Sequence, residues 1–163
     1  MKSFTILTLF SMLSTGFQNS VSFKNAPEET GSSVISAFKK SSIEEYSALL
    51  PTLSEFHQIM DANDKLYGGF LTEAKREFAV RYEQEIIKSV KASFKTVLAE
   101  GNKRGINWQN VEFVRVKSGT PGKENPVQLD IVFREKEKEY TLRIANAFIW
   151  QGQWRVTQFI ELI

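Results

Sequence analysis

The spacing of the apolar residues changes partway along this chain. From Ser33 to Gly101 they recur every three or four residues, which is typical of amphipathic helices. From Val111 onward they alternate with polar residues, which is typical of strands with one buried face. Helices followed by a run of strands predict an α+β fold with an antiparallel sheet.

The first part of the pattern predicts three short helices. They are expected to begin at Ser33, after Ser42, and after Thr52 or Ser54. Ser42 and Glu45 have the spacing of a capping box, in which each side chain accepts a hydrogen bond from the backbone of the other.

A long helix is predicted over about 72–100, with Thr72 as its N-cap and Gly101 as the glycine that ends it. One face is apolar and comprises Ala74, Phe78, Tyr82, Ile86, Val90, Phe94, Val97 and Leu98. Basic residues gather toward the end of this helix and just beyond it, namely Lys88, Lys91, Lys95, Lys103 and Arg104. They fit either a solvated face that complements the helix dipole or a surface for an anionic partner.

Four strands are predicted in about 111–163, and we expect them to form a curved antiparallel sheet. They cover 111–117, 127–134, 140–150 and 154–163. The charged segment 135–139 and the pair Gln151-Gly152 are the expected turns. Asn146 interrupts the alternation of the third strand, which predicts a β-bulge.

The N-terminus has the pattern of an export signal. Lys2 is the only charge before Lys24, an apolar core covers 4–13, and Ser20 and Ser22 offer small residues to a signal peptidase. We therefore predict a signal peptide over 1–22, a flexible lead-in over 23–32 and a single domain over 33–163. The chain has no cysteine for lipid attachment, so the predicted product is periplasmic or secreted and not a lipoprotein.

Composition limits the classes of function. Removal of residues 1–22 from the 163-residue chain leaves 141 residues, the size of one domain. The remaining 20 basic and 19 acidic residues give a net charge of +1, which by itself offers no argument for a nucleic-acid or anionic-membrane partner. After the signal no apolar run is long enough to span a membrane. The lack of cysteine excludes disulfides, thiol nucleophiles and cysteine-bound metals.

The closing hairpin over 148–156, with Gly152, Trp154 and Val156 at alternate positions, carries a resemblance. Together with the order of helices and strands, it resembles the nuclear-transport-factor-2-like superfamily of SnoaL-like and cystatin-like α+β rolls, in an uncharacterised, exported bacterial branch. The resemblance covers 33–163, although the strand pair that members often place between their early helices is not evident. It implies a sheet that curls around helices and leaves a conical pocket, which the enzymes line with Asp, His or Tyr. No enzyme motif of the family matches, so no catalytic residue is transferred.

Two residues are candidates for acid–base chemistry. Asp130 lies on the polar side of the second predicted strand, where a carboxylate inside a curved sheet could act as a base. The alternative is a solvated outer face. His57 is the only histidine and lies among apolar residues of a short helix, so it is either a base or a histidine at the edge of the core.

Three aromatic residues are candidates for ligand binding: Trp150, Trp154 and Tyr82. Trp108, before the first strand, is a further tryptophan of this kind, and packing in the core is the alternative for all of the tryptophans.

No metal site is predicted, because the acidic segment 61–64 lacks the glycine and the distal glutamate of a calcium loop. The segment 119–123 lacks the glycine spacing of a phosphate loop. We expect no cofactor.

The sequence therefore favours an exported, non-catalytic domain that binds a small apolar ligand or an envelope protein, with homodimerisation through the sheet as a further expectation. The alternative is an enzyme of the SnoaL or ketosteroid-isomerase kind, with Asp130 or His57 as the base in an apolar pocket.

Overall fold

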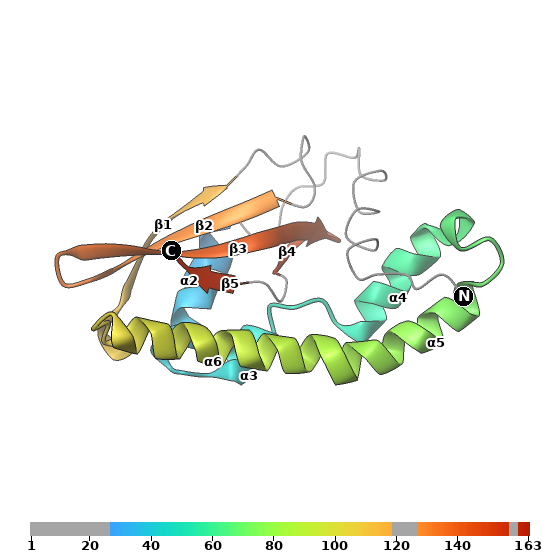
Figure 1. Cartoon of the computed structure of the whole chain (residues 1–163). Helices are drawn as coiled ribbons and strands as arrows, with labels where there is room; N and C mark the ends of the chain where they lie inside the picture. Colours follow the sequence, from blue (N-terminus) through green and yellow to red (C-terminus); the bar gives the residue numbers. More distant parts are fainter. Residues whose placement is uncertain (1–26, 119–126, 157–159) are drawn as a thin grey trace.

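The computed structural model describes residues 27–118, 127–156 and 160–163, so the predicted signal peptide and the loop 119–126 lie outside the described residues. Within them, helices precede a curled antiparallel sheet, and the predicted α+β class is confirmed (Figure 1). The first elements are α2 (Pro27–Lys39), α3 (Ile43–Ser47), α4 (Leu53–Ala62) and the short 3-10 helix η2 (Asp64–Tyr67). None of the helices in the described residues is both long and apolar enough to cross a membrane.

The start of α2 corrects the prediction of a flexible lead-in. The helix begins at Pro27, so residues 27–32 belong to the fold. Proline suits the first helical position, because the amide it lacks would have no partner there. Thr30 and Gly31 are buried, and a Cβ at Gly31 would lie 2.9 Å from the Phe113 ring. The pattern of large apolar residues did not reveal this turn, because it packs through small residues.

The capping predictions have a mixed outcome. The Ser42 hydroxyl accepts a hydrogen bond from the Glu45 amide at 3.2 Å, which confirms Ser42 as an N-cap. The Glu45 carboxylate does not close the box, because it binds Lys40 at 2.8 Å instead. A complete capping box forms one helix later, between Thr52 and Glu55.

One continuous helix of 33 residues runs beneath the sheet (Figure 1). It consists of α5 (Leu71–Arg81), the π-helical segment η3 (Tyr82–Ile86) and α6 (Ile87–Lys103). Its apolar positions from Ala74 to Phe94 are spaced four residues apart, and in a regular α-helix each such step would turn the side chain by about 40° away from the core. The wider π turn absorbs part of this drift and keeps Tyr82 and Ile86 buried.

The ends of the long helix differ from the prediction. Phe70, and not Thr72, is the N-cap, and it contributes no side-chain hydrogen bond. Gly101 lies inside α6, where a Cβ would be 2.6 Å from Cε2 of Trp108. Gly105 has the left-handed backbone, at φ 79°, that Gly101 was expected to adopt. The glycine at 101 is therefore needed for close packing.

The sheet follows the order β1-β2-β3-β4, with β5 also paired to β3. Its strands are β1 (Glu112–Ser118), β2 (Val127–Glu135), β3 (Lys138–Trp150), β4 (Gln153–Val156) and β5 (Ile160–Leu162). The predicted fourth strand 154–163 thus consists of two segments. Both pair with β3, with Ala147 opposite Val156 and Ile144 opposite Ile160, so the register shifts by one residue between them.

Local features of β3 agree with the prediction. Leu129 pairs with Ile144, but Val127 pairs with Ala147, so β3 holds one residue more than β2 in this interval. The bulge predicted at Asn146 is therefore confirmed. The turn to β4 has Gln151 and Gly152 at positive φ, as a tight hairpin requires.

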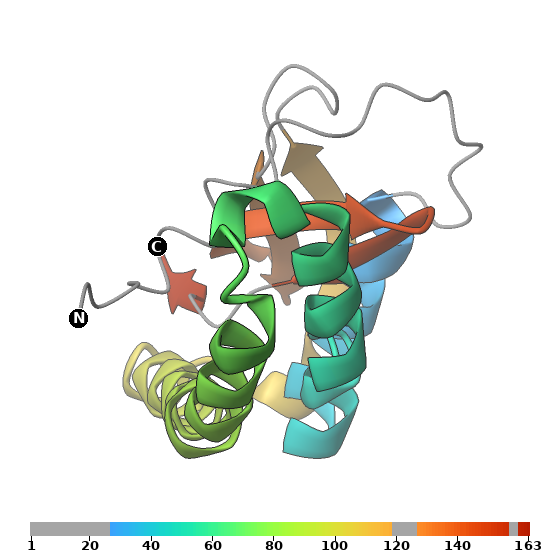
Figure 2. The ribbon, with the colours of Figure 1, turned by 90° about the vertical axis from the view of Figure 1, so that its right-hand side faces the viewer.

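The core contains two groups of aromatic side chains. The first lies between the sheet and helices α2, α3 and α6, and comprises Phe38, Tyr46, Phe94, Trp108, Phe133 and Tyr140. The second joins α4 to α5 and η3 through Phe56, Phe78 and Tyr82. Figure 2 shows α4 and α5 side by side at this end of the molecule.

Candidate functional site

Asp130 lies on the outer face of the sheet, because it alternates in β2 with the fully buried Leu129 and Ile131. Arg143 on β3 donates hydrogen bonds to both of its carboxylate oxygens, at 2.8 and 3.0 Å, and Lys117 is opposite it on β1. The hydrogen bonds from Arg143 lower the pKa of Asp130, and burial opposes them only in part. A general base in a pocket would need the opposite shift.

Further ion pairs cover the same outer face. Arg115 forms two hydrogen bonds with Glu139, at 3.2 and 3.0 Å, and Arg134 contacts Glu112 at 3.1 Å. Paired charges of this kind are typical of a solvated sheet face. The structure therefore favours the alternative reading of Asp130, a residue of the outer surface.

His57 is half-buried on α4, and its Nε2 atom is buried without a hydrogen-bond partner in the part of the chain that the structure describes. Its neighbours are engaged elsewhere, since Glu55 binds Arg155 and Gln58 binds Gln151. No described carboxylate orients the imidazole, and no hydrogen bond or ion pair joins His57 to Asp130. The two candidate bases do not form a catalytic pair.

The three aromatic candidates for ligand binding are buried. Trp150 and Trp154 are 6% and 4% exposed, and their opposite partners in the hairpin are Gln153 and Ile149. They therefore lie on opposite faces of a hairpin that is covered on both sides, in agreement with the packing alternative. The Tyr82 hydroxyl donates a hydrogen bond to the Pro51 carbonyl at 3.0 Å, in the second aromatic group.

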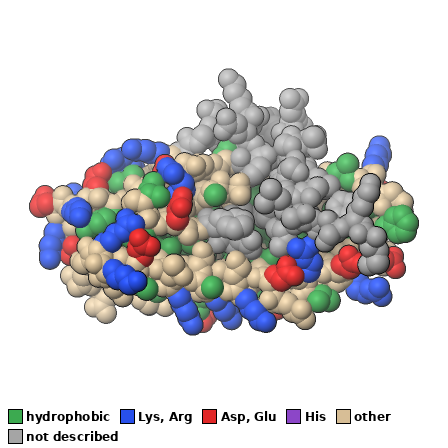
Figure 3. Space-filling view, in the orientation of Figure 1, with side chains coloured by type: hydrophobic (Ala, Val, Ile, Leu, Met, Phe, Trp, Pro, Cys, Tyr) green, Lys and Arg blue, Asp and Glu red, His purple; other side chains and the backbone are tan. Residues whose placement is uncertain are grey.

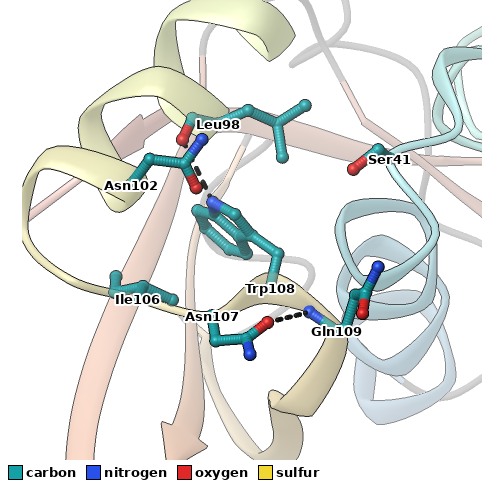
Figure 4. A pocket seen from close by; sticks show the side chains of 7 residues that line it. All are labelled: Ser41, Leu98, Asn102, Ile106, Asn107, Trp108 and Gln109. Carbon is teal, nitrogen blue, oxygen red and sulfur yellow. Dashed lines mark hydrogen bonds between the residues drawn. The ribbon is translucent and has the colours of Figure 1, made fainter.

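A depression of about 490 Å³ lies at the C-terminal end of the long helix (Figure 4). Its lining comes from the second residue after α2, from the last two turns of α6 and from the segment that leads to β1. The lining residues are Ser41, Leu98, Asn102, Ile106, Asn107, Trp108 and Gln109. None of these side chains is ionisable, so the depression suits a neutral ligand.

Trp108 forms the floor of this depression. It lies in the 3-10 helix η4 (Trp108–Asn110), which Asn107 caps by accepting a hydrogen bond from the Gln109 amide. Its indole Nε1 donates to the Leu98 carbonyl at 3.1 Å, and its ring packs on Phe133 at 5.5 Å. Since only 5% of Trp108 is exposed, it cannot serve as an open stacking platform for a sugar.

The rim offers hydrogen-bonding groups that the fold does not use. The Ser41 hydroxyl and the side-chain amides of Asn102 and Gln109 make no hydrogen bond with another described residue. Figure 4 shows them arranged around Trp108, on different elements. The depression is open and partly apolar, and these three polar side chains are available to a ligand there.

The backbone of Ser41 is unusual. Its φ is 51°, and its amide and that of Ser42 donate to the carbonyls of Phe38 and Ala37, which is a Schellman ending of α2. Glycine normally occupies this left-handed position, because any Cβ there is strained. Serine at this position therefore costs some stability, and its side chain lines the depression.

The sequence pointed only to Trp108 in this region. The signal that we missed is the polar run Asn107, Gln109 and Asn110 around that tryptophan, directly after a helix. Ser41 could not be found this way, since it is distant in the sequence. Among the described residues there is no cluster of three or more His, Cys, Asp or Glu side chains suited to a metal ion.

Comparisons of the chain with models of protein families, with curated proteins and with solved structures gave no match.

Proposed function

We propose that this chain is an exported, non-catalytic domain that binds a small neutral ligand in the depression above Trp108. The observation that carries the proposal is the set of unused polar groups around a partly apolar floor. Ser41, Asn102 and Gln109 can donate and accept hydrogen bonds, and the half-buried Leu98 can supply apolar contact.

Export is proposed on the composition of residues 1–22. A single lysine, an apolar core and small residues before the cut have the order of a secretory signal. Cleavage after Ser22 would leave a periplasmic or secreted protein. It would also leave four residues before α2, so the described fold would be retained whole.

Membership of the nuclear-transport-factor-2-like superfamily is part of the proposal. Its support is the succession of helices and a curled antiparallel sheet. The sheet face toward the helices carries fully buried side chains, among them Leu129, Ile131, Phe133, Leu142 and Ile144. We therefore place the ligand site at the end of the sheet near Trp108, and not in a cone at its centre.

Two edges of the sheet, those of β5 and β1, favour a small ligand over a protein that adds a strand. The β5 edge is covered by α6, because Ser93 and Arg104 donate to the Ile160 and Leu162 carbonyls at 3.4 and 3.1 Å. The β1 edge has a bulge after Phe113 and the charged Arg115. Bulges and charges at an edge disfavour pairing with another strand, including that of a second copy.

No observation favours the enzyme alternative. The carboxylate of Asp130 is held in an ion pair on the outer face, with a lowered pKa. The two candidate bases share no contact.

Nuclear magnetic resonance can test the proposed site. We would titrate the protein with a panel of neutral sugars, polyols and nucleosides and follow the Trp108 indole and the Asn102 and Gln109 side-chain amides. We expect saturable shifts confined to these signals for at least one class of compound. An Asn102→Ala variant should bind about tenfold more weakly, because one hydrogen bond is lost.

Gln84→Ala is the matched control, since Gln84 is an exposed amide in η3 of the same long helix. It should leave the affinity unchanged. Shifts spread evenly over the surface, or equal weakening in both variants, would contradict the proposed site.

A further inference from the structure

Three lysines on α6 lack an ionic partner among the described residues. Lys88, Lys91 and Lys95 are exposed, and no ion pair joins them to any other residue that the structure describes. The nearest acids of the long helix are already paired: Glu85 contacts Arg81 at 3.2 Å, and Glu100 contacts Arg104 at 2.6 Å.

The three lysines share one face of the helix. Their spacing of three and four residues places them within an arc of about 60° and about 10 Å along the axis. Figure 3 shows basic side chains following one another along the lower edge of the molecule, where Figure 1 places α6. We call these three residues the lysine row.

The helix dipole does not account for the lysine row. The dipole acts on charges in the last turn, but α6 continues to Lys103, eight residues beyond Lys95. Like charges three or four residues apart also destabilise a helix slightly. The lysine row therefore costs the fold a little, with no compensation from the described residues.

The form of the surface indicates what it would bind. Ala92 and Ala99, which are exposed and small, lie between and beside the lysines on the convex surface of a helix. Lysine carries a compact, hydrated charge on a flexible stem, whereas arginine is preferred for directed, bidentate recognition. Such a surface suits an extended layer of negative charge better than a single anionic ligand.

We propose that the lysine row docks this protein onto an anionic phospholipid bilayer through electrostatic attraction. The binding is peripheral and reversible, because no apolar anchor belongs to the row. Each lysine near such a surface contributes roughly fivefold to the partition coefficient, and the attraction weakens as salt shortens the Debye length. The proposal is independent of the ligand site at Trp108.

Vesicle flotation tests the proposal. The protein is mixed with vesicles of phosphatidylcholine alone or with an equal part of phosphatidylglycerol, at about 20 mM and about 300 mM salt. We expect binding only to the anionic vesicles, and only at low salt. The variant Lys88→Gln/Lys91→Gln/Lys95→Gln should lose roughly a hundredfold in partition coefficient.

The control variant is Lys65→Gln/Lys117→Gln/Lys136→Gln, which removes the same net charge from exposed lysines outside the long helix. Circular dichroism establishes that both variants fold. Equal losses in the two variants, or no binding by the unaltered protein at low salt, would overturn the proposal. So would binding to polyglutamate without binding to vesicles, which would instead assign the row to an acidic protein.

Discussion

Arg155 on β4 donates two hydrogen bonds, from Nε and Nη2, to Oε1 of Glu55 on α4, at 3.0 and 2.6 Å. The other carboxylate oxygen of Glu55 accepts from the Thr52 amide at 2.7 Å. The two charged side chains are only 18% and 16% exposed. One carboxylate thus caps α4 and joins that helix to the closing hairpin.

Loss of this carboxylate should destabilise the protein. We expect Glu55→Ala to lower the free energy of unfolding by about 2–3 kcal/mol, because it removes a helix cap and leaves Arg155 partly buried without its partner. Urea unfolding followed by tryptophan fluorescence measures the change. Glu85→Ala, at an exposed pair with Arg81, should cost less than about 0.5 kcal/mol. Equal costs at the two positions would contradict this role of Glu55.

Stability should fall in acid. Burial raises the pKa of Glu55, but the hydrogen bonds from Thr52 and Arg155 outweigh it and lower the pKa, and Arg143 lowers the pKa of Asp130. Both carboxyls therefore bind a proton less readily in the folded state than in the unfolded state. Their contribution is complete above the unfolded values of about 4 and is lost as pH falls below them.

Urea unfolding at about pH 6, 4 and 3 would measure this loss. The double variant Glu55→Gln/Asp130→Asn should be less stable at about pH 6 and should lose less stability on acidification. If the variant lost as much stability in acid as the unaltered protein, other carboxyls would be responsible.

Gly101→Ala should destabilise the protein, although alanine is the better helix former. Propensity alone would favour the change by about 1 kcal/mol. The new Cβ would collide with Trp108, whose ring packs between core aromatic residues and cannot move freely. We expect a net loss of about 1–3 kcal/mol in urea unfolding. A gain in stability would show that the indole yields to the new methyl group.

Ser41→Gly should separate stability from binding. Glycine relieves the left-handed strain at φ 51°, so we expect a gain of up to about 1 kcal/mol. Affinity for the ligand of the Trp108 depression should fall, because the hydroxyl is lost. Ser41→Ala is the control: it should lose the same affinity without the gain in stability. Unchanged affinity in both variants would remove Ser41 from the site.

Local features of the fold were predictable because they depend on neighbours in the sequence. The cap at Ser42, the turn at Gln151 and the bulge at Asn146 each follow from residue type and spacing over a few positions. The face of a strand residue was harder to predict. Asp130 alternates with apolar neighbours, but this pattern does not determine whether the sheet face that carries Asp130 lines a pocket or is exposed to solvent.

Long-range contacts decided the remaining features. Gly101 follows the pattern of a helix end, yet it is determined by Trp108, which reaches it only in the folded state. The first helix was predicted to begin at Ser33, six residues after its true start at Pro27, because its first turns pack through Thr30 and Gly31. The π segment was implied by the four-residue spacing of apolar positions, a signal that we did not use.

The sequence by itself determined the class of the fold, the order of its elements and most of their turns, because periodicity and capping act within a few residues. Only the tertiary structure decided which polar residues meet. Ser41 and Asn102 lie 61 positions apart in the chain and still line one depression. Packing of α2, α6 and η4 on a shared aromatic core places them at the same depression, and no local pattern in the chain encodes that arrangement.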